Sequence, residues 1–398
     1  MMNKKKIFAS RTEWPLSVNS LSSLLGELKG HKAPLIDLTE SNPTRCDFKF
    51  PSEQFLKILS GSSGLHYDPG PRGSFKAREA ISGYYQKKHF RVAPDQIFLT
   101  SSTSEAYSFL FRLLVDVDQR VLFPRPSYPL FQYFVDLNDI QVEYYPLILE
   151  RGAWRINFQQ FKDEKFTNSR AIVLVNPNNP TGSFIQKKEF PFLNEFCGRN
   201  QIPIISDEVF SDFCFDEQFQ SSSLVENREV LTFTLGGLSK TLALPQMKLS
   251  WIIVSGPQKT TQEACDRLEV IADTYLSVNT PVQNALPFWL EEKELIQGEI
   301  YKRLKDNLDY LREKCSKSQS AEMIEPQGGW YAVLKFKAKM SEEEFVLRLL
   351  KEDRVFVHPG YFFDFEDEGY IVLSLLPQAE TFQTGVGRIL NFLNSGRS

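Results

Sequence analysis

Short apolar segments alternate with longer amphipathic segments through the middle of the chain. The apolar segments are rich in valine, isoleucine and leucine and show little polar alternation, which is typical of strands covered on both faces. They predict strands at residues 96–100, 120–123, 170–176, 202–207, 229–235 and 249–255, with helices between them, notably 103–115 and 187–199. This alternation predicts an α/β fold with a large, mostly parallel, doubly wound sheet.

The remainder of the chain predicts a second, smaller α/β unit. A long helical region at 258–315 is interrupted at 279–281 and is followed by a helix at 341–351, strands near 355–358 and 370–375, and a closing helix at 379–394. A helix is also predicted at 18–29, and the sequence leaves open whether it packs with this smaller unit. Because 398 residues exceed one ordinary core, we expect a large domain at 47–290 and a small domain built from 1–46 and 291–398.

Composition and charge exclude several classes of protein. Hydrophobic residues make up 42% and charged residues 24%, which argues against a disordered chain. The 46 basic and 50 acidic residues give a net charge of −4, so we expect no nucleic-acid or membrane partner. The five cysteines are scattered and the four histidines lack metal-ligand spacing, which predicts reduced thiols, no metal site and a cytoplasmic protein.

Polar residues follow several of the predicted strands, at the sheet edge where ligands of such folds bind. Ser102, Thr103 and Ser104 open the helix after strand 96–100, and the unpaired N–H groups of a helix start suit a phosphate. Ser102 and Glu105 also have the spacing of a capping box, which is the simpler interpretation of this segment alone.

Two further strands end in loops with candidate chemistry. Residues 176–182 combine three asparagines with two X-Pro steps and a glycine, so they form either a purely structural turn or a set of rigid amide donors. Asp207 ends the next strand, where a buried carboxylate is costly unless it is paired. For a lone aspartate, a helix cap or an ion pair would be the simpler interpretation.

A lysine follows the strand at 229–235. Gly236 and Gly237 allow a close approach of the backbone to another group, and Ser239 and Lys240 follow. A lone lysine is usually solvated, but a lysine amine of lowered pKa can form a Schiff base. None of these segments decides the function alone, whereas their order along the chain does.

In this order the segments resemble those of the class I/II aminotransferases, which are fold-type I enzymes dependent on pyridoxal 5′-phosphate (PLP). Residues 176–182 reproduce the family's Asn-Pro-x-Asn-Pro-Thr-Gly, and Asp207 and the Ser239-Lys240 pair follow at family-like spacing. The resemblance extends from residues 38–43 to the C-terminal helix. It implies an aminotransferase that moves an amino group from an amino acid or amine to a 2-oxo acid.

The resemblance also implies roles for individual residues. Lys240 would bind PLP as a Schiff base and move a proton, Asp207 would pair with the pyridine nitrogen, and Asn179 would donate to the ring oxygen. The phosphate would be held by Ser102, Thr103, Ser104, Ser239 and, in place of the family's arginine, Lys248. Tyr128 would stack on the cofactor or be an ordinary core aromatic, and residues 357–363 match a turn that lines the substrate mouth.

A shared site is implied as well. Tyr67, with Gly73 and Arg78, matches a family segment whose tyrosine reaches the phosphate of the neighbouring subunit. The resemblance therefore implies a homodimer in which each copy completes the site of the other.

Three departures from the family pattern bear on chemistry. Phe210 replaces a tyrosine that donates to the ring oxygen, so we expect a higher pKa for the Schiff base. Lys248 keeps a positive charge but not the two-pronged guanidinium, beside Ser250 where glycine is usual. Val372 stands where an arginine binds the substrate carboxylate, so either another cation does so or the substrate lacks a carboxylate there. Loop arginines that are candidates for that cation are Arg45, Arg72 and Arg125.

Two other functions remain open from the sequence. A PLP-dependent lyase or decarboxylase could use the same scaffold, and product analysis would separate it from a transaminase. A non-catalytic PLP-binding module is disfavoured, because the enzyme-like part occupies the whole chain.

Overall fold

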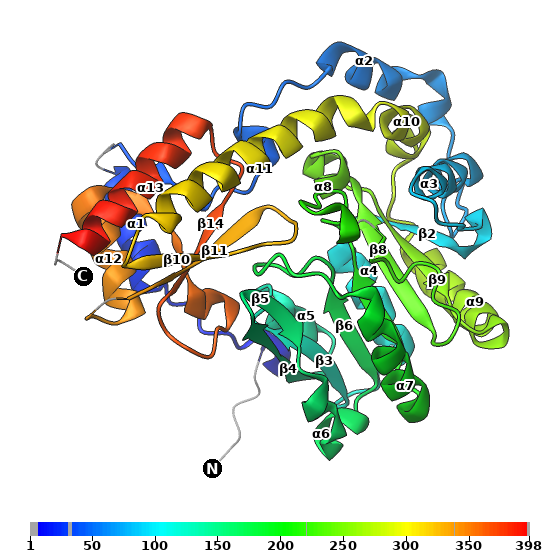
Figure 1. Cartoon of the computed structure of the whole chain (residues 1–398). Helices are drawn as coiled ribbons and strands as arrows, with labels where there is room; N and C mark the ends of the chain where they lie inside the picture. Colours follow the sequence, from blue (N-terminus) through cyan, green and yellow to red (C-terminus); the bar gives the residue numbers. More distant parts are fainter. Residues whose placement is uncertain (1–6, 31–33, 220, 338, 396–398) are drawn as a thin grey trace.

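The largest sheet lies at the centre of one half of the molecule (Figure 1). Within the part of the chain that the computed structural model describes, residues 7–30, 34–219, 221–337 and 339–395, this sheet has eight strands in the order β2-β9-β8-β7-β6-β3-β4-β5. They are β2 (Ile97–Thr100), β3 (Arg120–Arg125), β4 (Gln141–Glu150), β5 (Ala153–Ile156), β6 (Ala171–Val175), β7 (Ile204–Asp207), β8 (Thr232–Gly237) and β9 (Ser250–Ser255). The adjacent strands β8, β7, β6, β3 and β4 run parallel to one another, which confirms the predicted sheet.

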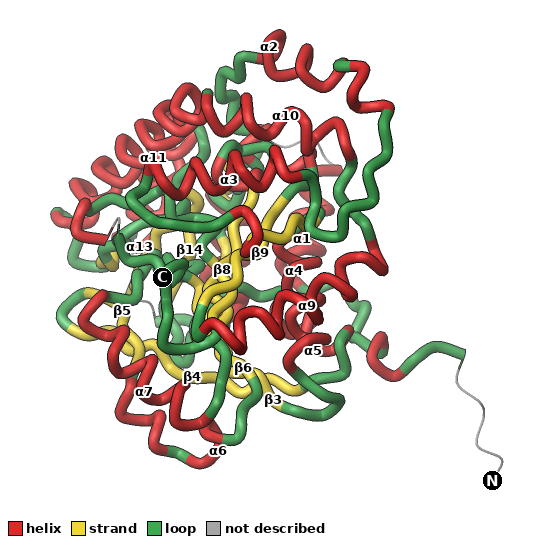
Figure 2. Tube along the Cα trace, turned by 90° about the vertical axis from the view of Figure 1, so that its right-hand side faces the viewer, coloured by secondary structure: helices red, strands yellow, loops and turns green. Residues whose placement is uncertain are grey.

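Helices cover both faces of this sheet, and Figure 2 shows its strands in the interior of the molecule. One face packs on α4 (Thr103–Leu114), α5 (Phe131–Leu137) and α9 (Gln258–Tyr275). The other packs on α3 (Phe75–Lys87), α6 (Glu164–Thr167), α7 (Phe190–Asn200) and α10 (Thr280–Glu291). In β6, Val173 faces the first group and Ile172 the second, and both are fully buried. Burial on both sides explains the absence of polar alternation.

The sequence pattern did not reveal the edge of the sheet. The strands β4 and β5 form an antiparallel hairpin whose turn, Arg151-Gly152, has positive φ at both residues. Because β4 is only partly buried and mixes charged with apolar side chains, it gives no continuous apolar segment. β9 also differs from a parallel strand, since it is antiparallel to both β2 and β8.

A second sheet forms the core of the other half of the molecule (Figure 1). Among the described residues it has four antiparallel strands, β10 (Ala321–Ile324), β11 (Tyr331–Phe336), β14 (Tyr370–Ser374) and β13 (His358–Pro359). Helices α11 (Lys293–Ser316), α12 (Glu342–Asp353) and α13 (Ala379–Asn394) pack around it. The N-terminal segment joins this unit, because α1 (Ser20–Gly30) packs on α12 and β1 (Ile36–Asp37) pairs with β12 (Val355–Phe356).

The predicted smaller α/β unit from both ends of the chain is therefore confirmed. The proposed limits of the two domains, at residues 46/47 and 290/291, stay a prediction. α11 runs from the end of α10 to the second sheet (Figure 1). The short α2 (Ser52–Lys57) lies near the start of α11 in Figure 1. One further helix, α8 (Leu238–Thr241), is a single turn after β8.

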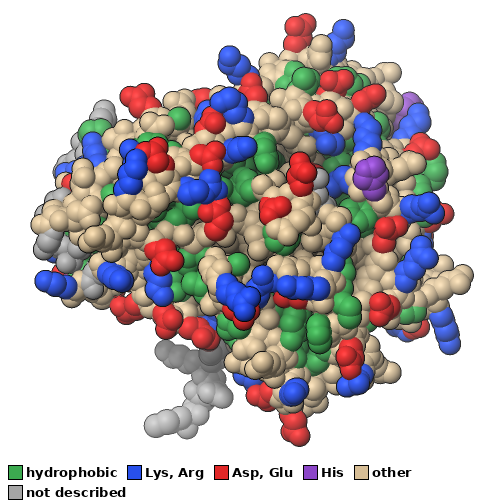
Figure 3. Space-filling model, viewed as in Figure 1, with side chains coloured by type: hydrophobic (Ala, Val, Ile, Leu, Met, Phe, Trp, Pro, Cys, Tyr) green, Lys and Arg blue, Asp and Glu red, His purple; other side chains and the backbone are tan. Residues whose placement is uncertain are grey.

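The face shown in Figure 3 carries side chains of both charges. On the side shown in Figure 3, acidic and basic side chains are interspersed over both halves of the molecule. Within the described residues, none of the helices is both long and apolar enough to cross a bilayer.

Candidate functional site

The carboxyl ends of β6, β7 and β8 lie next to one another. Asp207 pairs with Val175 on one side and with Leu235 on the other. The segments that follow these strands therefore start from one edge of the sheet, where parallel strands place their ligands. This edge brings together the asparagine loop, Asp207 and the helix that carries Lys240.

Asp207 is buried and hydrogen-bonded. One carboxylate oxygen accepts from the Tyr107 hydroxyl at 3.0 Å and the other from the Val209 N–H at 3.2 Å. Burial raises the pKa of Asp207 to about 6, although these two hydrogen bonds and Lys240 oppose the rise. The carboxylate is thus held in place, and a cation beside it would be favoured.

Lys240 lies between aromatic rings. Its Nζ atom is 4.8 Å from the centre of the Trp330 ring and 5.3 Å from that of Phe210. Burial lowers the pKa of Lys240 to about 8, while the negative charge of Asp207 opposes the fall. A lysine of this pKa has an appreciable fraction of neutral, nucleophilic amine near neutral pH.

The asparagine loop serves both structure and the site. Asn176 accepts from the Ile185 N–H, and Asn178 accepts from the Thr181 hydroxyl at 2.9 Å, so these two residues brace the loop. Asn179 is different, because its side-chain oxygen is buried without a hydrogen-bond partner. A ligand group that donates would satisfy this oxygen, whereas a ligand oxygen would need the amide nitrogen of Asn179 as its donor.

The start of α4 approaches the same edge. Ser102 caps α4 by accepting from the Glu105 N–H at 3.1 Å. The expected capping box is only half formed, since the Glu105 carboxylate binds the Ser101 N–H and the Ser277 hydroxyl instead. Tyr107, one turn into α4, touches Asp207, which places the helix start close to the end of β7. Thr103 is partly buried and Ser104 exposed.

The glycines before Lys240 allow the expected close approach of the backbone to another group, which is the neighbouring strand β9. A Cβ atom at Gly236 would lie 2.5 Å from the Trp251 indole nitrogen, and one at Gly237 would lie 2.3 Å from the Ser250 hydroxyl. Both glycines therefore permit close packing of β8 on β9. Ser250, where the family has glycine, is the residue that fills the space beside Gly237.

Comparison with known proteins decides the family. The model of the class I and II aminotransferases matches residues 33–389. The chain belongs to this family. Relatives include the glutamate-pyruvate aminotransferase of Haemophilus influenzae, 26% identical with 93% of each chain covered, and the alanine aminotransferase of Mycobacterium bovis, 24% identical with 93% of this chain and 88% of the relative covered. The solved alanine aminotransferase of Pyrococcus furiosus is 25% identical, with a TM-score of 0.86 and 94% and 96% coverage.

The protein is therefore a PLP-dependent aminotransferase, as the motifs predicted. The residues at the sheet edge fit this cofactor by their chemistry. PLP presents an aldehyde, a pyridine nitrogen, a ring oxygen and a phosphate, and the edge offers an amine, a buried carboxylate, the Asn179 side chain with its amide donor, and a helix start.

The other predicted residues of the aminotransferase lie at different depths. Tyr128 is 36% exposed and packs edge-on against Phe131. Burial raises its pKa to about 12, with Tyr331 and Asp207 adding to the rise, so it lies within the electrostatic reach of Asp207. Ser239 is partly buried in α8, whereas Lys248 is exposed.

Tyr67 lies at the surface of the molecule. It is 73% exposed and lines a surface groove of about 390 Å³ with residues 64–73 and 276–283. Gly73 adopts a φ of 81°, and the Arg78 guanidinium braces this turn through the Gly73 carbonyl.

Sequence reasoning missed three residues of the site. Tyr107 holds Asp207, Trp330 lies over Lys240, and Tyr331 packs against Phe210. Tyr107 carried a signal, since it follows the predicted helix start by one turn and so faces the same edge. Trp330 directly precedes β11 of the second sheet and Tyr331 begins it, and no local pattern connects them with Lys240.

The three candidate arginines lie in different surroundings. Arg72 contacts Glu269 and the Asp95 carbonyl before β2, at the opposite end of that strand from Ser102. Arg125 donates to the Asp364 carbonyl at 3.0 Å, beside residues 357–363. Arg45 is exposed and lies 3.8 Å from Glu40. Val372 is fully buried and pairs with Val333 and His358, so no charge is available at that position.

Proposed function

We propose that Lys240 is the amine that binds the PLP aldehyde and that carries the proton between substrate and cofactor. The observation that supports this role most strongly is the position of its Nζ atom. It lies 4.8 Å from the centre of the Trp330 ring, with a pKa of about 8 and Asp207 in electrostatic reach. A neutral amine can form a covalent bond with an aldehyde, and a protonated one can return a proton.

The remaining residues would orient the cofactor. When bound, PLP withdraws electrons from the substrate's α-carbon, and Asp207 would favour this by keeping the pyridine nitrogen protonated. Asn179 would donate to the ring oxygen, and Tyr128 would cover one face of the ring. The start of α4, with Ser102, Thr103 and Ser104, would hold the phosphate together with Ser239 and Lys248.

The substrates would be an amino acid donor and a 2-oxo acid acceptor. The relatives are named glutamate-pyruvate and alanine aminotransferases, so glutamate with pyruvate is the first pair to test. Since residue 372 is an apolar valine, the substrate carboxylate would have to be bound by another cation. Arg125 and Arg45 are the candidates, because Arg125 borders the turn at 357–363 and Arg45 lies near Ser41, which hydrogen-bonds Tyr331.

The functional unit would be a cytoplasmic homodimer with shared sites. Apolar side chains are exposed around the groove that contains Tyr67, and Leu65 is 90% exposed there. An exposed apolar surface of this kind marks an interaction site. A second copy seated on it would receive the Tyr67 hydroxyl at its own phosphate site.

The visible spectrum of the purified protein tests this assignment. With PLP bound, we expect an absorbance band that Lys240→Ala abolishes and that single amino acids convert when no acceptor is present. Conversion would identify the class of donor. A band that persists in Lys240→Ala would exclude Lys240 as the binding amine, and a wild-type band that no amino donor converts would contradict the proposed half-reaction.

A further inference from the structure

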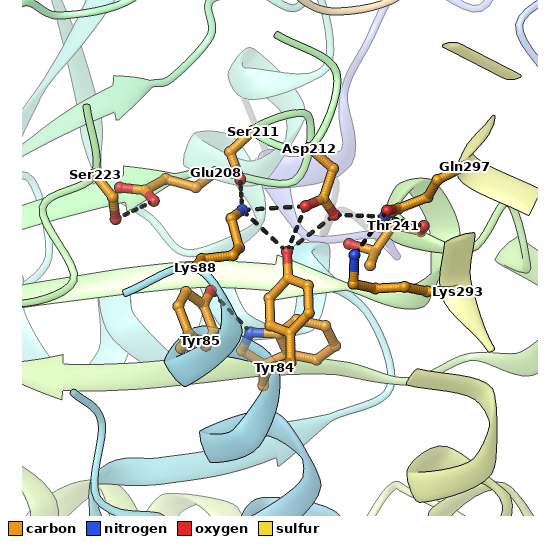
Figure 4. Close-up of polar contacts among 11 residues, drawn as sticks. Tyr84, Tyr85, Lys88, Glu208, Ser211, Asp212, Ser223, Thr241, Lys293 and Gln297 are labelled. Carbon is orange, nitrogen blue, oxygen red and sulfur yellow. Dashed lines mark hydrogen bonds and ion pairs between the residues drawn. The ribbon is translucent and has the colours of Figure 1, made fainter. Parts of the chain in front are cut away.

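A partly buried polar cluster lies beside the short helix that carries Lys240 (Figure 4). Its centre is the Asp212 carboxylate, which accepts from the Tyr84 hydroxyl at 2.9 Å and from the Lys88 ammonium at 3.1 Å. Burial raises the pKa of Asp212, but Lys88 and Lys293 outweigh it and bring the pKa below its ordinary value. The carboxylate is therefore charged at neutral pH.

Gln297 of α11 connects this carboxylate with α8. Its side-chain nitrogen donates to Asp212 Oδ2 at 2.9 Å and to the Thr241 carbonyl at 2.8 Å. An amide nitrogen has two hydrogens, so both are used. The amide oxygen accepts from the Lys293 ammonium at 3.1 Å, which fixes the orientation of the amide because an ammonium can only donate.

Thr241 directly follows Lys240 and ends α8. A helix of one turn is not stable by itself, and its last carbonyls need partners from elsewhere. Gln297 supplies such a partner. The position of α8, and with it the position of the Lys240 backbone, therefore depends on α11.

Asp212 belongs to the segment that begins at Asp207. Between them Glu208 is fixed by the Ser206 hydroxyl at 2.8 Å, the Ser223 hydroxyl at 2.6 Å and the Leu224 N–H at 3.0 Å. This segment is thus held at both of its ends. Gln297 spans from it to α8, through Asp212 and the Thr241 carbonyl.

We propose that Gln297, anchored by the Asp212–Lys88 pair, is a positioning residue for the reaction: it holds Lys240 at a fixed distance and direction from Asp207. The proposal rests on the function proposed above for Lys240. A buried ion pair contributes little net stability by itself, whereas a displacement of about 1 Å at reacting groups can reduce a rate a hundredfold. Orientation is therefore the main consequence of the cluster.

Gln297→Met tests the proposal, because methionine keeps the length of the side chain and removes the two donated hydrogen bonds together with the one accepted from Lys293. Gln262→Met is the matched control, since the exposed Gln262 of α9 also donates to an aspartate, Asp266. In the PLP-bound proteins we would measure the rate constant of conversion by a donor, the donor concentration for half-maximal rate, and the pKa of the visible band. Urea unfolding of the cofactor-free proteins reports stability.

For Gln297→Met we expect the rate constant to fall at least about tenfold and the pKa of the visible band to shift. The donor concentration for half-maximal rate should stay within about twofold of the wild-type value. Gln262→Met should match the wild type in all three. An unmoved pKa or an unchanged rate constant in Gln297→Met would overturn the proposal. Should this variant not fold, Lys88→Met/Asp212→Leu removes the anchor without leaving a lone buried charge, and the same results apply. Failure of the role of Lys240 itself would show separately, as a band that persists in Lys240→Ala.

Discussion

Lys240 and Asp207 show opposite shifts of pKa that have one cause. Burial disfavours the charged form of each, so the pKa of the amine falls to about 8 and that of the carboxyl rises to about 6. Burial is the leading influence on both groups, and the attraction between Lys240 and Asp207 opposes the pKa shift of each. The two residues are therefore prepared for a ligand that supplies an aldehyde to one and a positive charge to the other.

Replacement of Lys240 should stabilise the protein when no cofactor is present. The folded-state pKa of about 8 lies below the ordinary 10.5, so burial of the charge costs stability below pH 8 and this cost is relieved as the pH rises from 8 to 10.5. We expect Lys240→Met to raise the free energy of unfolding by about 1–2 kcal/mol at pH 7, and less at pH 10. Urea unfolding at both pH values measures this, with the exposed Lys259→Met as control; a gain that grows with pH would contradict it.

Phe210→Tyr should lower the pKa of the visible band of the PLP-bound enzyme. The Phe210 ring lies 5.3 Å from the Lys240 nitrogen and is almost fully buried, so a hydroxyl added there would stabilise a negatively charged ring oxygen nearby. A spectrophotometric pH titration of both proteins provides the measurement. A pKa that stays the same or rises in Phe210→Tyr would show that residue 210 does not set it.

At the scale of single elements, Glu342 fixes the turn at 357–363 from the start of α12. Its buried carboxylate accepts the N–H groups of Tyr361, Gly369 and Tyr370 at 2.9–3.0 Å. Glu342→Gln should lower the free energy of unfolding by about 2 kcal/mol. The glutamine NH2 group would face backbone N–H groups that need an acceptor, and two donors cannot form a hydrogen bond. The neighbouring exposed Glu343→Gln should cost less than about 0.5 kcal/mol. Equal losses in urea unfolding of the two variants would contradict this role.

At the scale of the whole molecule, the exposed apolar surface around Tyr67 should be the contact between two copies. Leu65→Glu places a charge at a side chain that is 90% exposed, and we expect it to shift sedimentation from dimer to monomer and to weaken PLP binding. Val117→Glu is the control, since Val117 is also exposed but lies after α4, away from the groove. A Leu65→Glu protein that stays dimeric would place the interface elsewhere.

Tyr67→Phe separates the shared site from the interface. It removes only the hydroxyl, so we expect the protein to remain a dimer while its affinity for PLP falls by about tenfold to a hundredfold, as for one lost hydrogen bond to a charged group. Equilibrium dialysis against PLP, at a protein concentration where sedimentation shows a dimer, measures the change. Unchanged affinity would mean that Tyr67 does not reach a phosphate.

The sequence by itself determined the parallel core, the family and the motifs of the site. Strands buried on both faces are continuous apolar segments, as in 171–175, and the asparagine loop, Asp207 and Lys240 each follow such a strand. These features are local along the chain, so a pattern of neighbouring residues is enough to reveal them. The edge strand β4 was missed because it is only partly buried and its side chains are mixed.

Only the tertiary structure decided what surrounds Lys240. Trp330 comes from the second sheet, Tyr107 from α4 and Gln297 from α11, and each reaches the site across a large separation in sequence. It also showed that the group beside Gly236 and Gly237 is the neighbouring strand β9. Contacts between distant segments depend on how whole elements pack, and the periodicity of one segment carries no information about the residue that another segment places beside it.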